Sequence, residues 1–282
     1  MSVRELTRIR VRTADDAVLH LEGSRTGHSV LLLHGLGYAS WAAQQLRQAL
    51  GEELALWSLD NRGTGRSTRG RRGLSIELLA ADAALAIEAL GRPAIVVGYS
   101  MGGYIAQLLA LSRPELVRQL TLVGTSPGGA GSVPVPDNTR KVWLDAADET
   151  PEQYARRTMP LSFREGWPQS HHDEYEDVIR ARLTYPTPSS IWREQYHACE
   201  RFLQRGAQTA QLSVPTLILH GGADRVLPPA NGRAIASLIP TARYRELPGA
   251  GHLLHLEQPD TVAAEIRRFV SHLVHHHGIT KE

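Results

Sequence analysis

The sequence is poor in cysteine and lysine. Of its 282 residues, one is cysteine (Cys199) and two are lysine. A single cysteine cannot close an intramolecular disulfide, so we expect a cytoplasmic protein and a buried, structural role for this thiol. An uncharged stretch at Pro93–Ser112 contains three glycines, and its apolar period changes midway. It indicates a buried strand followed by a buried helix, and we expect no membrane partner.

Neither sign of charge is in large excess. There are 31 basic and 29 acidic residues, which give a formal net charge of +2. This balance does not support a nucleic-acid partner. Hydrophobic residues make up 42% of the chain and charged residues 21%, as in ordinary globular proteins, and the chain is long enough to bury a large core.

Short apolar segments alternate with longer segments of helical periodicity. The apolar segments are rich in Val, Ile and Leu, which is typical of parallel strands buried on both faces. We expect strands at Ser29–Leu33, Leu54–Leu59, Ala94–Val97, Gln119–Val123 and Thr216–Leu219. We expect helices at Ser40–Leu50, Ser75–Leu90, Met101–Ser112 and Pro259–Leu273. After an opening hairpin of Leu6–Val11 and Ala17–Leu21, the alternation predicts an α/β fold with a doubly wound, mostly parallel sheet.

The segment 126–212 interrupts this alternation. It has no clear buried strand, and it contains eight of the sixteen prolines and nine of the sixteen aromatic residues. A loop of this length without structure of its own would be exceptional. We therefore expect a helical cap at 126–212, inserted between two parts of one core, 1–125 and 213–282. Its helices are expected at Asp137–Ala147, Glu152–Met159, Glu174–Leu183 and Ser189–Arg205.

The motif most specific for a function lies where the strand at 94–97 meets the next helix. Gly98-Tyr99-Ser100-Met101-Gly102 has the pattern G-x-S-x-G, in which a sharp turn exposes a serine at the end of a sheet. Glycines two residues before and two after the serine remove the Cβ atoms that would collide in such a turn. Ser100 is therefore the candidate nucleophile.

A serine hydroxyl needs a base, and the base needs a carboxylate partner. His252 follows Gly249-Ala250-Gly251 before the last predicted helix, and Asp224 lies just beyond the strand at 216–219. The order Ser, Asp, His along the chain is that of the α/β-hydrolase triad. His220 and His255 are the alternative bases.

A tetrahedral intermediate also requires hydrogen-bond donors for its oxyanion. The expected donors are the backbone N–H groups of Met101, at the start of a helix, and of Leu36, in the loop His34-Gly35-Leu36-Gly37. We expect His34 to order this loop rather than to take part in catalysis.

The segment Asp60–Ser67 is rich in glycine but lacks the spacing of a phosphate-binding loop. We interpret it as a structural turn in which Asp60 and Arg62 hold the loop near the site. It begins a basic run without acids, which we expect to be solvated, with attraction of an acidic substrate as the alternative. The run consists of Arg62, Arg66, Arg69, Arg71 and Arg72.

Together these motifs resemble the α/β-hydrolase superfamily, and among its members the capped serine hydrolases. The elbow Gly98-Tyr99-Ser100-Met101-Gly102-Gly103 is similar to those of enol-lactonases and methylesterases that act on small esters. The resemblance covers nearly the whole chain outside the cap. It implies a helical cap over a doubly wound sheet and leaves the substrate open, because the cap determines it.

The expected reaction is hydrolysis of a small to medium carboxylic ester, lactone or thioester with an apolar part, through an acyl-Ser100 intermediate. Trp143 and Trp192 in the aromatic-rich cap are our candidates for the substrate pocket. We expect neither a cofactor nor a metal ion, and the sequence does not indicate an oligomeric state. The alternatives are carbon–carbon bond hydrolysis or perhydrolysis on the same triad, or a non-catalytic ligand receptor with this fold.

Overall fold

The computed structural model of the protein describes residues 6–145 and 149–276. Eight strands form one sheet in the order β1-β2-β4-β3-β5-β6-β7-β8. The strands are β1 (Thr7–Arg12), β2 (Val18–Gly23), β3 (His28–Leu33), β4 (Leu54–Asp60), β5 (Ala94–Tyr99), β6 (Val117–Val123), β7 (Thr216–Gly221) and β8 (Arg243–Leu247). The strand β2 runs antiparallel to both of its neighbours, and the other neighbouring pairs are parallel. The predicted mostly parallel sheet is confirmed.

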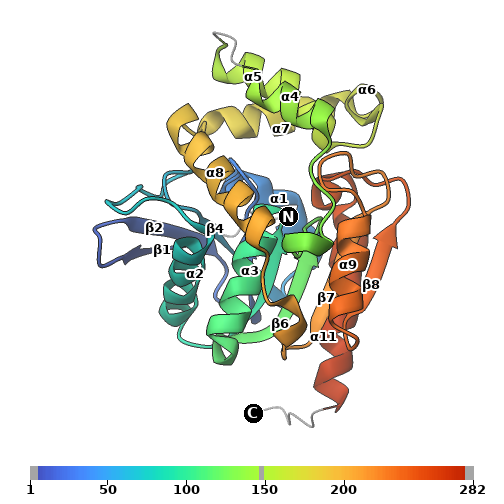
Figure 1. Cartoon of the computed structure of the whole chain (residues 1–282). Helices are drawn as coiled ribbons and strands as arrows, with labels where there is room; N and C mark the ends of the chain where they lie inside the picture. Colours follow the sequence, from blue (N-terminus) through green and yellow to red (C-terminus); the bar gives the residue numbers. More distant parts are fainter. Residues whose placement is uncertain (1–5, 146–148, 277–282) are drawn as a thin grey trace.

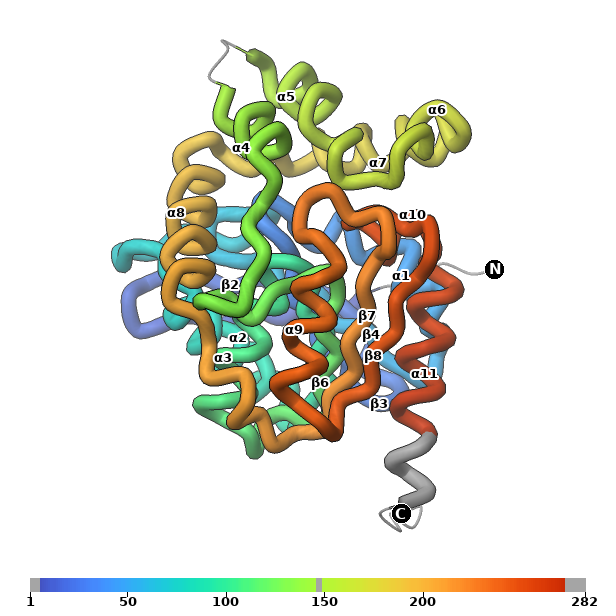
Figure 2. The backbone as a smooth tube through the Cα atoms, turned by 45° about the vertical axis from the view of Figure 1, so that its right-hand side comes forward, coloured from blue at the N-terminus to red at the C-terminus, as the bar shows by residue number. Residues whose placement is uncertain are grey.

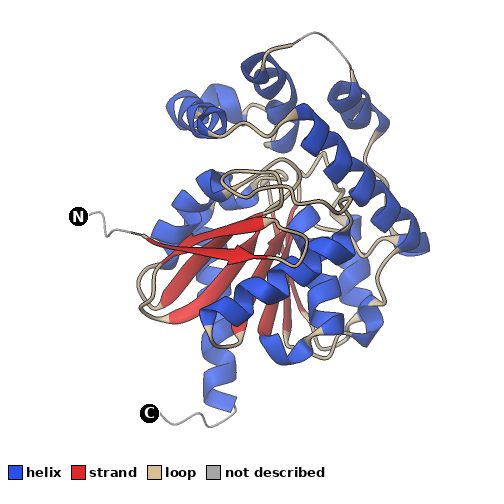
Figure 3. Cartoon of the chain, turned by 90° about the vertical axis from the view of Figure 1, so that its left-hand side faces the viewer, coloured by secondary structure: helices blue, strands red, loops and turns tan. Residues whose placement is uncertain are grey.

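Helices cover both faces of this sheet (Figures 1 and 3). One face carries α2, α3 and α9, and the other carries α1 and α11. The bounds are α1 (Gln44–Leu50), α2 (Ile76–Leu90), α3 (Met101–Ser112), α9 (Ala230–Leu238), α10 (Leu254–Glu257) and α11 (Pro259–His276). Short 3-10 helices lie at Ser40–Ala43, Pro114–Leu116, Gly129–Gly131, Met159–Ser162 and Thr209–Gln211. The helix α9 was not predicted from the sequence.

The two-residue period of the strands divides the core into two layers. In β3, Leu31 and Leu33 pack with the residues of α2 and α3, whereas Val30 and Leu32 pack with those of α1 and α11. All four side chains are at most 1% exposed. Burial on both faces explains why these strands are continuous apolar runs in the sequence.

Between β6 and β7 the chain forms a group of helices that lies beyond the carboxyl ends of the parallel strands (Figures 1 and 2). We call it the inserted helices. They are α4 (Asp137–Leu144), α5 (Pro151–Thr158), α6 (Trp167–Ser170), α7 (His172–Thr184) and α8 (Ser189–Arg205). The helix predicted to reach Ala147 ends at Leu144, and residues 146 and 147 lie outside the described part of the chain. The single turn α6 was not predicted.

The last inserted helix, α8, contacts both the other inserted helices and the core of the sheet. Its first turns lie among the other inserted helices, and its later turns descend along α3 (Figure 2). Ala198, Cys199 and Phe202 on this second part join the core layer of α2 and α3, where Phe202 stacks on Tyr104 at 4.4 Å between ring centroids. Cys199 is buried there, and burial raises the pKa of its thiol.

No helix within residues 6–145 and 149–276 combines the length and apolar character needed to cross a bilayer.

Candidate active site

The order of the strands reverses direction at β3. From β3 the chain moves to β4 on one side, and from β4 it crosses to β5 on the other side of β3. The loops that leave β3 and β5 therefore separate at their carboxyl ends, which is where open α/β sheets bind ligands. Leu36 lies in the first of these loops, and Ser100 directly follows β5.

Ser100 occupies a strained backbone conformation, with φ 54° and ψ −118°. Positive φ is unfavourable for a residue with a Cβ, so the surroundings must hold it. Its N–H donates to the carbonyl of Val123 (2.9 Å), and its own carbonyl accepts from Gly103 N–H and from the Thr125 hydroxyl, both at 2.8 Å. These bonds fix the turn that exposes the serine.

The flanking glycines are required by close backbone approach. A Cβ on Gly98 would collide with the carbonyl of Gly102, and a Cβ on Gly102 would collide with the carbonyl of Leu33. The elbow is therefore packed directly against the end of β3. The same packing brings the loop after β3 over the serine, since a Cβ on Gly35 would lie 3.2 Å from Cβ of Ser100.

Three side chains that are distant in the sequence form a continuous hydrogen-bonded chain. Oγ of Ser100 lies 2.9 Å from Nε2 of His252, and Nδ1 of His252 lies 2.7 Å from Oδ2 of Asp224. His252 and Asp224 are buried, whereas Ser100 is partly exposed. The structure thus brings together the three residues selected from the sequence.

Asp224 is held as an anion by its neighbours. Its Oδ1 accepts hydrogen bonds from the backbone N–H groups of Val226 and Leu227, both at 2.8 Å. Burial raises the pKa of Asp224, but His252 and His220 beside it outweigh burial and lower that pKa to about 2. An ionised carboxylate at this position orients the His252 ring and stabilises a positive charge on it.

The other histidines near the site have different partners. His255 lies in α10 with its ring 4.3 Å from that of Tyr99, and His34 Nε2 lies 2.6 Å from Oγ of Ser58. Burial lowers the pKa of each to about 3, so both are neutral. His220 contacts Asp224, with Nε2 3.3 Å from Oδ2. Of these histidines, His252 is the one hydrogen-bonded to Ser100.

The two expected oxyanion donors lie beside the nucleophile. Met101 is the first residue of α3, so its N–H is one of the free donors at the N-terminus of that helix. Leu36 lines the same cavity as Ser100 and His252. The loop of Leu36 is also tied to α8, because Gln195 Oε1 accepts a hydrogen bond from Gly37 N–H (2.9 Å).

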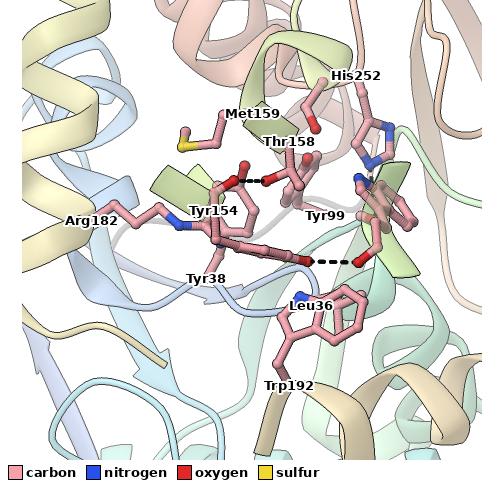
Figure 4. Close-up of a pocket in the computed structure, with 12 residues that line it drawn as sticks. Leu36, Tyr38, Tyr99, Tyr154, Thr158, Met159, Arg182, Trp192 and His252 are labelled. Atoms are coloured by element: carbon pink, nitrogen blue, oxygen red, sulfur yellow. Dashed lines mark hydrogen bonds between the residues drawn. The ribbon is translucent and has the colours of Figure 1, made fainter. Parts of the chain in front are cut away.

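A small cavity of about 40 Å³ is lined by Ser100 and by residues of the inserted helices. Figure 4 shows the side chains that line it. Trp143 and Trp192, the two tryptophans expected in the pocket, both line it. Its other lining residues are Leu36, Tyr38, Tyr99, Ser100, Tyr154, Thr158, Met159, Ser162, Arg182 and His252. A larger groove of about 590 Å³ lies outside it among the inserted helices, and Trp143, Tyr154, Arg182 and Trp192 line both spaces.

The loop that begins at Asp60 is a structural element. Asp60 Oδ1 accepts from Ser40 N–H (2.7 Å), and its Oδ2 accepts from Arg66 N–H (2.9 Å). Arg62 is 2% exposed and donates to the carboxylates of Asp15 and Asp82. The loop is thereby joined to the opening hairpin and to α2.

The basic run at 62–72 meets acids from elsewhere in the chain. Besides Arg62, ion pairs link Arg66 to Glu22 (2.9 Å), Arg69 to Glu194 (2.7 Å) and Arg71 to Asp16 (2.7 Å). Four of the five arginines of the run therefore have a carboxylate partner within the chain. The alternative that the run attracts an acidic substrate loses its basis.

Two groups near the site were missed in the sequence. Arg182 in α7 lines the cavity, and Oε1 of Glu257 accepts hydrogen bonds from Gly251 N–H and Arg164 N–H, each at 3.0 Å. Arg182 had a detectable signal, because it continues the buried face of α7 seven residues after Tyr175. Glu257 had none. Within the described residues, no cluster of three or more His, Cys, Asp or Glu side chains is arranged to hold a metal ion.

Comparison with known proteins identifies the family of the chain. The model of the alpha/beta hydrolase family matches residues 30–265. BpoC of Mycobacterium tuberculosis H37Rv, provisionally named a non-heme bromoperoxidase, is 29% identical over 89% of this chain and 97% of its own. The pimeloyl-acyl-carrier-protein methyl ester esterase of Nitrosomonas europaea is 26% identical over 86% of this chain and 96% of its own.

A solved structure of an esterase has the same fold. A thermophilic esterase from Thermogutta terrifontis superposes with a TM-score of 0.77 at 28% identity, covering 94% of this chain and 98% of the esterase. The matched region, 30–265, contains the loop after β3 and the elbow with Ser100, as well as Asp224 and His252. The chain is therefore a hydrolase that belongs to the alpha/beta hydrolase family.

Proposed function

We propose that this protein is a serine hydrolase that cleaves a carboxylic ester, lactone or thioester through an acyl-Ser100 intermediate. The observation that carries the proposal is the hydrogen-bonded chain from Ser100 Oγ to His252 Nε2 (2.9 Å) and from His252 Nδ1 to Asp224 Oδ2 (2.7 Å). The esterase names of two of the relatives support the same class of reaction.

In the first half of the reaction, Ser100 Oγ attacks the carbonyl carbon of the substrate while His252 Nε2 takes the hydroxyl proton. The negative charge that develops on the carbonyl oxygen is stabilised by the N–H groups of Met101 and Leu36. When the tetrahedral intermediate collapses, the bond to the leaving oxygen or sulfur breaks, and that atom takes the proton held by His252. The alcohol or thiol of an ester or thioester departs, whereas the hydroxyl from a lactone stays attached to the acyl chain. The acyl group remains on Ser100.

In the second half, His252 takes a proton from a water molecule, which attacks the acyl carbon. Collapse of this second intermediate returns the proton to Ser100 Oγ and releases the carboxylic acid. Asp224 stays ionised throughout and stabilises the imidazolium form of His252, in keeping with its pKa of about 2.

The shape of the site supports a substrate with a small group next to the scissile bond and an apolar remainder. The cavity at Ser100 has a volume of about 40 Å³, and the groove outside it is bordered by Trp143 and Trp192. A substrate longer than a few atoms would therefore extend past these tryptophans into the groove.

Labelling with a fluorophosphonate, read by intact-protein mass, tests the proposal. We expect one adduct on the wild type, none on Ser100→Ala, and strongly slowed labelling of His252→Ala. Ser112→Ala, which changes an exposed serine at the end of α3, should label as the wild type does. Ser100→Ala should also reduce kcat by about 10⁴-fold or more.

Full labelling of Ser100→Ala, or a folded wild type that neither labels nor turns over esters, lactones or thioesters, would overturn the proposal. The second result would favour a ligand receptor. Turnover of a β-diketone without turnover of simple esters would favour carbon–carbon bond hydrolysis instead.

A further inference from the structure

One cation faces the site from the inserted helices. Arg182 lies in α7, seven residues after the buried Tyr175 and four after the buried Val178, so it lies on the helix face that packs inward. It is only partly exposed and lines the same cavity as Ser100 and His252. Figure 4 shows its side chain extending toward Tyr38 and Tyr154.

The guanidinium also reaches the loop that carries a proposed oxyanion donor. A Cβ on Gly37, the residue after Leu36, would lie 4.0 Å from Nη2 of Arg182. The centre of the guanidinium lies 5.4 Å from the ring centroid of Tyr38. Arg182 is therefore fixed at the boundary between the Ser100 cavity and the outer groove, both of which it lines.

Arg182 differs from the other arginines around it. Arg156 pairs with Glu176 (2.6 Å), Arg157 pairs with Glu149 (2.6 Å), and Arg180, two residues before Arg182, pairs with Asp177. Within residues 6–145 and 149–276, no carboxylate forms such an ion pair with Arg182. The residues that line the Ser100 cavity include no Asp or Glu.

A partly buried cation without a carboxylate partner favours the binding of an anion. The Tyr38 ring at 5.4 Å stabilises the guanidinium, and its hydroxyl can accept a hydrogen bond from it. A guanidinium has five N–H donors, so donors remain for a carboxylate or a phosphate. We propose that Arg182 binds an anionic group of the substrate, a carboxylate or a phosphate, located several atoms from the scissile carbonyl. This inference rests on the proposed function, since it assigns the substrate class of the same site.

Matched pairs of substrates test the inference. The first arm compares mono-4-nitrophenyl esters of dicarboxylic acids of six to nine carbons with the neutral 4-nitrophenyl esters of equal chain length. The second arm compares 4-carboxyphenyl hexanoate with phenyl hexanoate, which places the anion on the leaving group. Together the arms distinguish an anion on the acyl side from one on the other side of the scissile bond.

In the arm whose anion lies on the same side of the scissile bond as Arg182, we expect the wild type to prefer the anionic ester by about 10- to 100-fold in kcat/KM, mostly through KM. The other arm should show no such preference. Arg182→Gln should abolish the preference, so that the anionic and the neutral ester of a pair have equal kcat/KM. Arg182→Lys should retain part of it, and Arg180→Gln, on the exposed side of the same helix, should retain all of it. Added salt should weaken the preference in the wild type.

Thermal unfolding of each variant establishes that it is folded. Equal rates on anionic and neutral esters in both arms, or a preference that survives in folded Arg182→Gln, would overturn this inference while the hydrolase proposal stands. Failure of the wild type to hydrolyse the neutral esters and to react with the fluorophosphonate would instead overturn the proposed function, and the inference with it.

Discussion

Nε2 of His220 lies 3.3 Å from Oδ2 of Asp224, the same carboxylate oxygen that accepts the hydrogen bond from His252. The same nitrogen lies 2.8 Å from the carbonyl oxygen of Leu227, so a proton on Nε2 serves both acceptors. His220 is fully buried, and Gly232 leaves room for its ring, since a Cβ there would lie 2.5 Å from Nδ1. His220 thus provides a second contact that positions the carboxylate oxygen facing His252.

His220→Leu should therefore reduce kcat by about 10-fold, because Asp224 loses one hydrogen-bonding neighbour, with little change in KM. Steady-state kinetics on a reactive aryl ester measure the effect. His220→Gln, which can keep a donor near the position of Nε2, should recover most of the loss. Equal kcat for His220→Leu and the wild type would show that the contact is dispensable.

The pKa of Asp224 makes a prediction about acid stability. Its folded-state pKa is lowered from 3.8 to about 2, so its ionised form stabilises the fold above pH 4 and loses that effect as the pH falls toward 2. The difference in unfolding free energy between wild type and Asp224→Asn should narrow by about 1 kcal/mol between pH 5 and pH 3. Urea unfolding followed by circular dichroism gives both values. A constant difference would contradict the lowered pKa.

The close backbone approach at the elbow predicts that adding one methyl group at Gly102 strongly lowers the free energy of unfolding. Gly102→Ala would place its Cβ against the carbonyl of Leu33, and backbone on both sides cannot move freely, so we expect a loss of about 3 kcal/mol of unfolding free energy. The matched control is Gly73→Ala, where a Cβ would meet no atom within 4 Å and the change should stay within about 0.5 kcal/mol. Denaturant midpoints of the two variants test this difference directly.

Glu257 connects the loop of His252 to the inserted segment through two hydrogen bonds. Its Oε1 accepts from Gly251 N–H, next to His252, and from Arg164 N–H in the insertion. Glu257→Leu should cost about 3 kcal/mol of stability and lower kcat, because two backbone donors lose their acceptor and the His252 loop is loosened. Thermal unfolding and kcat measure the two effects.

Glu257→Gln keeps a side-chain oxygen for both donors and should stay close to wild type. It also removes a carboxylate whose pKa burial raises, and whose Oε2 has no hydrogen-bond partner among the described residues. A Glu257→Leu variant as stable and active as Glu257→Gln would refute the link.

The sheet and the elbow could be predicted because their sequence signals are local. Buried parallel strands are short apolar runs, and the glycines around Ser100 are required by contacts within the turn itself. The order of Ser100, Asp224 and His252 along the chain then predicted that the three side chains lie together. The hydrogen-bond distances between them depend on how β5, β7 and the loop of His252 pack, which the sequence does not show.

What could not be predicted depends on contacts between distant segments. The acids that neutralise the basic run, such as Glu194 for Arg69, lie far from it in the sequence. The helix α9 (Ala230–Leu238) follows two prolines and contains a glycine, which weakens its helical pattern, yet Ile235 is fully buried in the core. Arg182 continues the buried face of α7, but only the folded chain reveals the cavity that it faces.

The segment 160–164 is attached to the catalytic loops by hydrogen bonds to its main-chain carbonyls. Arg225, next to Asp224, donates to the carbonyls of Pro160 and Phe163, and Leu253 N–H, next to His252, donates to the carbonyl of Ser162 (2.8 Å). Within 160–164 the acceptors are all main-chain carbonyls, so the side chains of this segment can change as long as its path and Arg225 are kept. For protein engineering, this makes 160–164 a natural splice point: α5 and α7 on either side of it can be exchanged to alter substrate range, provided that Gln195 of α8, which holds the Leu36 loop, is kept.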